Sequence, residues 1–241
     1  MSKVIMQISM YLANALSVHI SLSPPNPPAA RQHVCTGTPE TDTLFERVVQ
    51  HITFLSKSSV WFFTVLNTTS TIVSHGIVFS CPVSHPRSVS TVIHPVFFLG
   101  TILTILSAIL RLWCFKCLGH LFTFEITIRP KHELITHGPY AYVRHPSYTG
   151  VYLTLIGATC VLLAPGNWTA DYGIRNPIGL ILLCLWLLKC SFAFRGMGVR
   201  LRAEDDLLHA NFVIICKSVR RLDVMEKLEV DSRWHVFIMK N

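Results

Sequence analysis

The sequence predicts an all-α fold, a polytopic membrane protein with about five transmembrane helices and a cytosolic C-terminal helix. Three observations lead to this fold class. Of the 241 residues, 51% are hydrophobic and only 14% are charged, whereas soluble domains carry about 25% charged residues. Several apolar stretches approach the ~20 residues that a spanning helix needs. Finally, the basic residues gather in alternate segments between these stretches.

The apolar stretches define five expected spans, at residues 4–22, 60–79, 95–112, 148–164 and 177–194. The third and fifth are the most apolar. The second carries a run of polar residues from Asn67 to Ser70 as well as His75, so it is a weaker span. The fourth is short for a crossing helix and could tilt or only dip into the bilayer.

The distribution of basic residues tests this arrangement. With five crossings, Lys3, Arg87 and Arg175 fall on one side, and the other eighteen of the 21 Lys and Arg residues lie in or beside the segments of the opposite side. The positive-inside rule therefore puts the loop before the fourth span and the C-terminus in the cytosol. A cleaved signal peptide at residues 4–22 would reverse that placement, so a retained span is favoured. The net charge of +8 indicates attraction to anionic lipid rather than nucleic-acid binding.

Between the spans, proline and glycine set the boundaries. Residues 23–30 form a proline-rich linker, and residues 40–57 could form a short polar helix. Gly138, Pro139 and Pro146 interrupt any helix, so residues 129–147 are expected to form an ordered loop. Leu201, Leu208 and Phe212 recur at helical spacing and predict an amphipathic cytosolic helix over 200–212. We expect three parts, which are N-terminal membrane segments and linker (1–90), a core (91–212) and a divergent tail (213–241).

The candidate site is the segment Gly-Pro-Tyr-Ala-Tyr-Val-Arg-His-Pro-Ser-Tyr-Thr-Gly at residues 138–150, which leads directly into an apolar stretch. Polar and aromatic groups against a membrane span are costly unless they serve a function. Simpler explanations exist for each residue. Arg144 and His145 could anchor the chain at the interface, the tyrosines could form an aromatic belt, and Arg200 and Glu204 could be an ordinary helix pair. Their ordered combination favours a site.

The run His-Glu-Leu-Ile-Thr-His-Gly-Pro-Tyr-Ala-Tyr-Val-Arg-His-Pro-Ser-Tyr-Thr-Gly at residues 132–150 resembles the signature of the isoprenylcysteine carboxyl methyltransferase family. A second block, Arg200-x-x-x-Glu204-Asp205-x-x-Leu208-x-x-x-Phe212, matches in the same order. The resemblance implies transfer of a methyl group from S-adenosylmethionine to the C-terminal carboxylate of a prenylcysteine. It implies partners that are prenylated protein C-termini or small prenylcysteine substrates, and a multi-pass protein of the endoplasmic reticulum membrane with a cytosolic active site.

The same resemblance assigns roles to individual residues. Arg200 would meet the substrate carboxylate, and Arg144 is the second residue expected on the substrate side. The cofactor-binding residues would be Glu125, His132, Glu133, Leu134, Ile135, Tyr140, His145, Pro146, Ser147, Tyr148 and Glu204. Glu125 stands where the family often has glutamine. No metal site is expected.

Other readings stay open. The motif does not separate prenylcysteine methyltransferases from phospholipid or amine methyltransferases of the same superfamily, and membrane sterol reductases share its style of sequence. After Phe212 the family expects a glycine, an acidic residue and an aromatic residue, but this chain continues Val-Ile-Ile-Cys-Lys. A mis-spliced or frame-altered tail is one hypothesis, and a non-catalytic membrane homologue is another.

Overall fold

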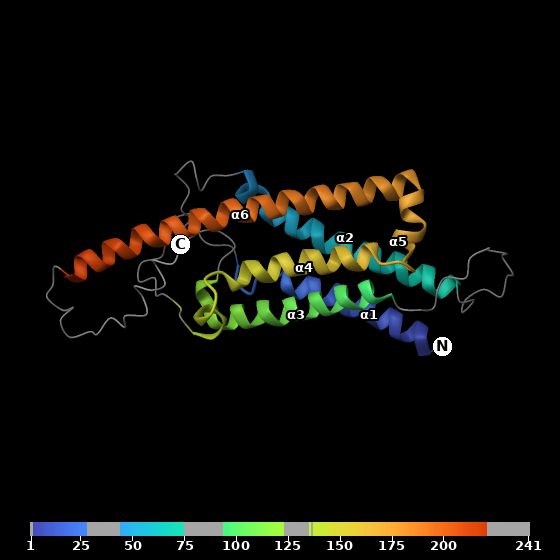
Figure 1. Cartoon of the computed structure of the whole chain (residues 1–241), viewed down its shortest axis with the longest axis horizontal. Helices are drawn as coiled ribbons and strands as arrows, with labels where there is room; N and C mark the ends of the chain where they lie inside the picture. The colour runs from blue at the N-terminus through green and yellow to red at the C-terminus, as the bar shows by residue number, and fades with distance from the viewer. Residues whose placement is uncertain (1, 28–43, 75–93, 123–134, 136, 221–241) are drawn as a thin grey trace. The chain divides into compact units, whose positions relative to one another are not determined.

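A computed structural model of the chain describes residues 2–27, 44–74, 94–122, 135 and 137–220, with side chains up to residue 206. The described residues form helices and no strand (Figure 1), which confirms the all-α prediction. The chain divides into two units, Met1–Met197 and Gly198–Asn241. The long elements are α1 (Ser2–Ser21), α2 (Leu44–Ser74), α3 (Pro95–Leu118), α4 (Pro146–Leu163) and α6 (Pro177–Arg220), with the short helix α5 (Trp168–Asp171) between the last two.

Within the described residues, four helical segments are long and apolar enough to cross a membrane, namely Lys3–Ser21, Pro95–Leu121, Pro146–Leu163 and Pro177–Asp206. They correspond to four of the five expected spans. The weak span expected at residues 60–79 falls largely within α2, which does not reach this hydropathy, and its last five residues lie outside the described part. The prediction of a separate short polar helix at 40–57 was wrong, because α2 is one continuous helix of 31 residues.

The topology nevertheless requires α2 to cross the bundle. Tyr11, halfway along α1, meets Phe97 near the start of α3, with ring centroids 4.9 Å apart. Further along both helices, Ser21 at the end of α1 meets Ser107 halfway along α3, with hydroxyl oxygens 3.4 Å apart. These two helices therefore run parallel, and the chain must return between them. The only long helix described between them is α2.

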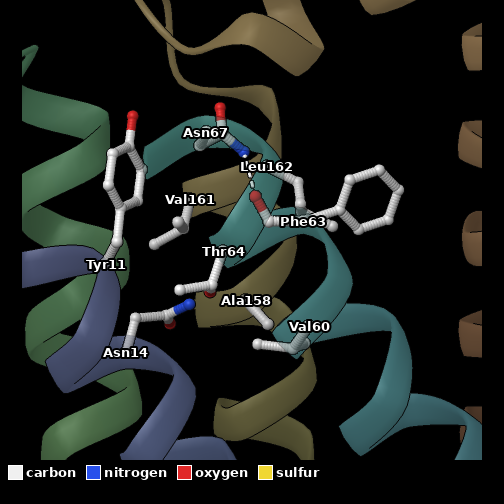
Figure 2. A pocket seen from close by; sticks show the side chains of 9 residues that line it. All are labelled: Tyr11, Asn14, Val60, Phe63, Thr64, Asn67, Ala158, Val161 and Leu162. Carbon is white, nitrogen blue, oxygen red and sulfur yellow. Dashed lines mark hydrogen bonds between the residues drawn. The ribbon is translucent and has the colours of Figure 1, made fainter. Parts of the chain in front are cut away.

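Contacts along α2 show this return. Lys57 donates a hydrogen bond to Ser23, just after the end of α1, over 3.3 Å. Further along α2, Asn67 lines a small cavity together with Tyr11 of α1 (Figure 2). Thus α2 runs antiparallel to α1, and if α1 and α3 span a membrane, α2 spans it as well.

The two faces of α2 explain how a helix of low mean hydropathy can cross a membrane. Its buried face mixes the polar residues Ser56, Thr64, Asn67 and Thr71 with apolar ones such as Phe63. Its exposed face carries large apolar side chains, namely Phe54, Leu55, Trp61, Phe62, Val65 and Val73. A helix that buries several polar residues and exposes large apolar ones suits a lipid environment, even where its mean hydropathy is low.

The tightest helix pair is α3 with α4, joined through small residues. A methyl group on Gly100 would lie 2.7 Å from the carbonyl oxygen of Gly157, and one on Gly157 would lie 2.8 Å from that of Gly100. The two backbones are thus in direct contact, which is typical of helices that associate in membranes. Towards the start of α4, Ser107 donates to the carbonyl oxygen of Gly150 and shares a hydrogen bond with Thr154.

The first part of α6 runs antiparallel to α4. Trp186 donates to Thr159 over 3.0 Å, and Tyr152 donates to the carbonyl oxygen of Phe194 over 3.3 Å. Lys189, a charged residue within this span, lies over the Trp186 ring at 3.6 Å from its centroid and donates to Ser56 over 2.9 Å. Residues 200–212 are helical as predicted, but this helix is continuous with the fifth span, because α6 runs without interruption to Arg220.

Candidate active site

The candidate site begins with a short loop folded onto the end of α3. Gly138 adopts φ +64°, a conformation that favours glycine, and opens the 3-10 turn η3 (Gly138–Ala141). A methyl group there would lie 2.6 Å from the sulfur of Cys117 and 3.2 Å from the indole nitrogen of Trp113. Tyr140, half-buried, is a hydrogen-bonding neighbour of the Cys114 thiol. Glycine at residue 138 therefore lets the loop approach α3 closely.

The second part of the site is the start of α4. His145 is its N-cap residue, and Pro146 occupies the first turn, where a missing N–H costs nothing. The expectation that Pro146 interrupts a helix is thus refined, since it begins one. The backbone N–H of Tyr148 donates to the carbonyl oxygen of His145 over 3.2 Å. The two rings meet edge to face, with centroids 5.6 Å apart and an interplanar angle of 62°.

A buried arginine of α3 joins the ends of α1 and α4. Arg111 of α3 is only 4% exposed, and its Nε donates to the carbonyl oxygen of Ser21 over 2.8 Å. Its Nη1 donates to the hydroxyl oxygen of Ser147. The guanidinium carbon also lies 4.5 Å and 5.3 Å from the ring centroids of Phe115 and Phe122. Hydrogen bonds and aromatic faces thus compensate for the burial of this charge.

The last glycine of the motif makes room for this arginine. A methyl group on Gly150 would lie 2.7 Å and 2.8 Å from Cγ and Cδ of Arg111. Any larger residue at 150 would displace the stem that carries the guanidinium to Ser147. Arg111 was not among the residues predicted for the site. Its signal in the sequence was an arginine inside an otherwise apolar span, which counted there only as a charge near the span's edge.

The structure locates part of the predicted site. Glu125, His132, Glu133 and Leu134 lie outside the described residues. Ile135 is half-buried, and Arg144 is exposed in the bend before α4. Five of the predicted residues lie together at the end of α3 and the start of α4, namely Tyr140, His145, Pro146, Ser147 and Tyr148.

Arg200 and Glu204 belong to the second unit, Gly198–Asn241. They lie one turn apart on α6, and both are half-buried. This i, i+4 spacing puts them on one face of the helix, as the sequence predicts. Their roles toward a substrate or cofactor stay predictions.

Two other features of the described residues do not form a competing site. No three His, Cys, Asp or Glu side chains there are grouped so that they could hold a metal ion. The cavity in Figure 2, lined by Tyr11, Asn14, Asn67 and six neighbours, has a volume of about 10 Å³. That is the lower limit for one water molecule, so the cavity excludes a cofactor.

Fold and loop together define a helical membrane protein with a polar motif at one end of its bundle. Residues 99–171 match the model of the Isoprenylcysteine carboxyl methyltransferase (ICMT) family, which confirms the resemblance over this segment. The match includes α4, the loop and Arg111. It ends before Arg200 and Glu204.

Curated relatives are similar over part of the chain. Two rice proteins (Oryza sativa subsp. indica and subsp. japonica), each named "Probable protein-S-isoprenylcysteine O-methyltransferase", are 33% identical over 72 residues, which are 29% of this chain and 38% of each relative. The "Uncharacterized protein YpbQ" of Bacillus subtilis (strain 168) is 32% identical over 113 residues, 46% of this chain and 56% of that protein. The matched segments thus span well under two thirds of these relatives. No solved structure matches the chain.

Proposed function

We propose that this protein is an S-adenosylmethionine-dependent protein-S-isoprenylcysteine O-methyltransferase, which methylates the C-terminal carboxylate of prenylated cysteine at a membrane surface. The observation that carries the proposal is the loop at residues 138–150. Its polar and aromatic side chains are folded onto the ends of two apolar helices and tied to a buried arginine. This loop lies wholly within the segment that matches the methyltransferase family.

The residues of the loop suit a sulfonium cofactor. Tyr140, His145 and Tyr148 are all half-buried, so each residue keeps part of its surface accessible. Aromatic faces attract cations by ~0.5–2 kcal/mol, which favours the sulfonium of S-adenosylmethionine beside them. When bound, S-adenosylmethionine supplies an electrophilic methyl group, which passes to a carboxylate oxygen as the carbon–sulfur bond breaks and its electron pair stays on sulfur.

The protein's part in such a reaction is orientation rather than acid–base chemistry. A carboxylate is already ionised and nucleophilic at pH 7, so no general base is needed. Arg200 would hold it by a charge-assisted hydrogen bond, and Arg144, exposed within the loop, is the second residue expected on the substrate side. Glu204 and the residues Glu125 and His132 to Ile135 would complete the cofactor site.

The bilayer explains the choice of a prenylated substrate. The exposed faces of the spanning helices carry large apolar side chains, such as Phe98, Leu106 and Ile109 on α3. A prenyl chain that leaves water for such surroundings gains about 0.8 kcal/mol per CH₂. Prenylated protein tails emerge in the cytosol, and the charge distribution favours that side for the loop and the C-terminus. We therefore place the site at the cytosolic face of the endoplasmic reticulum membrane.

Two alternatives make different predictions. A phospholipid or amine methyltransferase would transfer the methyl group to nitrogen, where a nearby cation such as Arg200 gives no advantage. A non-catalytic homologue would bind the cofactor without turnover.

The test is a comparison of acceptors. Membranes that contain the protein and lack endogenous activity receive radiolabelled S-adenosylmethionine with N-acetyl-farnesylcysteine, its amide, or phosphatidylethanolamine. We expect label in a base-labile ester with the free carboxylate alone, and a loss of at least tenfold in Arg200→Ala. Base-stable label in the phospholipid contradicts the assignment.

A further inference from the structure

The contact between Arg111 and Ser147 fixes the direction of a hydroxyl group inside the candidate site. An arginine N–H can only donate, so the Ser147 oxygen accepts in this contact. The hydroxyl hydrogen of Ser147 must then point away from Arg111, toward another acceptor. Ser147 is half-buried, so a ligand can reach it. Thus Arg111 makes Ser147 a donor, polarised by the neighbouring positive charge.

Arg111 is held rigidly enough for this task. Its Nε is bound to the carbonyl oxygen of Ser21 at the C-terminal end of α1, where a cation is favoured by the helix dipole. Its stem passes the bare backbone of Gly150. The guanidinium rests against Phe115 and Phe122, which restrict its rotation. The Nη1 group therefore meets Ser147 from a fixed direction.

The charge of Arg111 also selects what can lie beside Ser147. S-adenosylmethionine carries two cationic groups, the sulfonium and the α-amino group, and one anionic group, the α-carboxylate. A buried guanidinium repels the cations and attracts the anion, most strongly where water is excluded. Ser147, as a hydroxyl donor, likewise needs an acceptor. Both properties point to the carboxylate.

We propose that Arg111 is a positioning residue of the methyl-donor site, which orients Ser147 as a hydrogen-bond donor to the α-carboxylate of the bound nucleotide. This inference rests on the proposed function. It also makes the expected cofactor-binding role of Ser147 specific, because the sulfonium then lies away from Ser147, toward the aromatic rings.

The experiment measures nucleotide affinity without turnover. Isothermal titration of the full chain in detergent uses S-adenosylhomocysteine and its decarboxylated form, which differ only in the carboxylate. We expect the wild type to prefer the carboxylate form, and Ser147→Ala and Arg111→Gln each to weaken it about tenfold or more while leaving affinity for the decarboxylated form nearly unchanged. Arg111→Lys should recover only part of the preference, because a single ammonium cannot reproduce the paired geometry of Nε and Nη1.

The matched control is Arg175→Gln, which removes an exposed arginine in the turn before α6. It should leave both affinities unchanged. If Arg111→Gln does not fold, the affinities of Ser147→Ala decide the test. This variant loses only a hydroxyl group and keeps the side chain of Arg111 in place. An equal loss for both ligands, or no loss for either, overturns the inference.

The outcomes also separate this inference from the proposed function. If Ser147→Ala and Arg111→Gln abolish the carboxylate preference but the wild type forms no ester with any acceptor, the role of Arg111 is supported and the carboxyl methyltransferase is refuted. Ester formation with a preference that does not depend on Ser147 or Arg111 supports the enzyme and refutes this role. A folded wild type that binds neither nucleotide refutes both.

Discussion

Substitution of Gly157 by alanine tests the packing that brings α3 and α4 together. The added methyl group would lie 2.8 Å from the carbonyl oxygen of Gly100, 2.8 Å from Cγ2 of Thr104 and 3.1 Å from Cβ of Leu103. Ordinary contact begins at 3.4 Å, so the two helices must separate by about 0.6 Å. The nearest atom belongs to the backbone, and a side-chain rotation cannot relieve the clash.

The magnitude follows from two opposing terms. Overpacking of a tight interface costs about 1–3 kcal/mol. Alanine is a better helix former than glycine by about 1 kcal/mol, which offsets part of this cost. We expect Gly157→Ala to lower the free energy of unfolding by about 1 kcal/mol, with a range of roughly 0 to 2 kcal/mol.

The assay is reversible unfolding of purified protein in mixed micelles by titration with sodium dodecyl sulfate, followed by tryptophan fluorescence. The matched control is Gly198→Ala on α6, where a methyl group would have no neighbour within 4 Å. The control keeps the gain in helix propensity without the clash, so the two variants should differ by about 1–3 kcal/mol. Equal stability of the two variants would refute the direct backbone contact between α3 and α4.

Three further predictions concern buried polar groups. Ser107→Ala removes a hydroxyl that contacts Thr154 and the carbonyl oxygen of Gly150, and should destabilise the same unfolding transition by about 0.5–2 kcal/mol; no change would show that this cluster is not formed. Tyr11→Phe leaves Asn167 and Gln7 without the hydroxyl they share, and should cost about 1–3 kcal/mol in the same titration, whereas a neutral result contradicts that network. The Asn-x-Thr sequences that begin at Asn67 and Asn167 are potential N-glycosylation sites. Both should stay unglycosylated in microsomes, because both asparagine side chains are buried and hydrogen-bonded. A mobility shift of the protein on endoglycosidase treatment would contradict their burial.

Much of the fold could be predicted from hydropathy, because α1, α3, α4 and α6 each contain a long apolar run. For α2 the average composition was a poor guide. Ser56, Asn67 and Thr71 face the interior of the bundle, and only the structure shows that large apolar residues such as Trp61 and Phe62 face outward. Continuity was also missed. Polar residues before Val60 and after Phe194 suggested separate helices. Polar residues alone do not end a helix, however; a proline or a capping residue does.

The candidate site was predictable where it lies in one stretch of sequence. The motif from Tyr140 to Tyr148 could be recognised from its residue types and order. The contribution of Arg111 could not, because it depends on the close approach of α3 to the start of α4. Gly150 and Arg111 are structurally coupled, since the absence of a side chain at Gly150 makes room for the aliphatic stem of Arg111.

The most direct test of the account is methyl transfer by the purified protein alone in liposomes. With S-adenosylmethionine and N-acetyl-farnesylcysteine, we predict an ester that releases methanol in base, formed over repeated turnovers and reduced at least tenfold by Ser147→Ala at low cofactor concentration. Folded wild-type protein that binds S-adenosylhomocysteine but forms no ester would contradict the enzymatic function and leave a cofactor-binding membrane homologue.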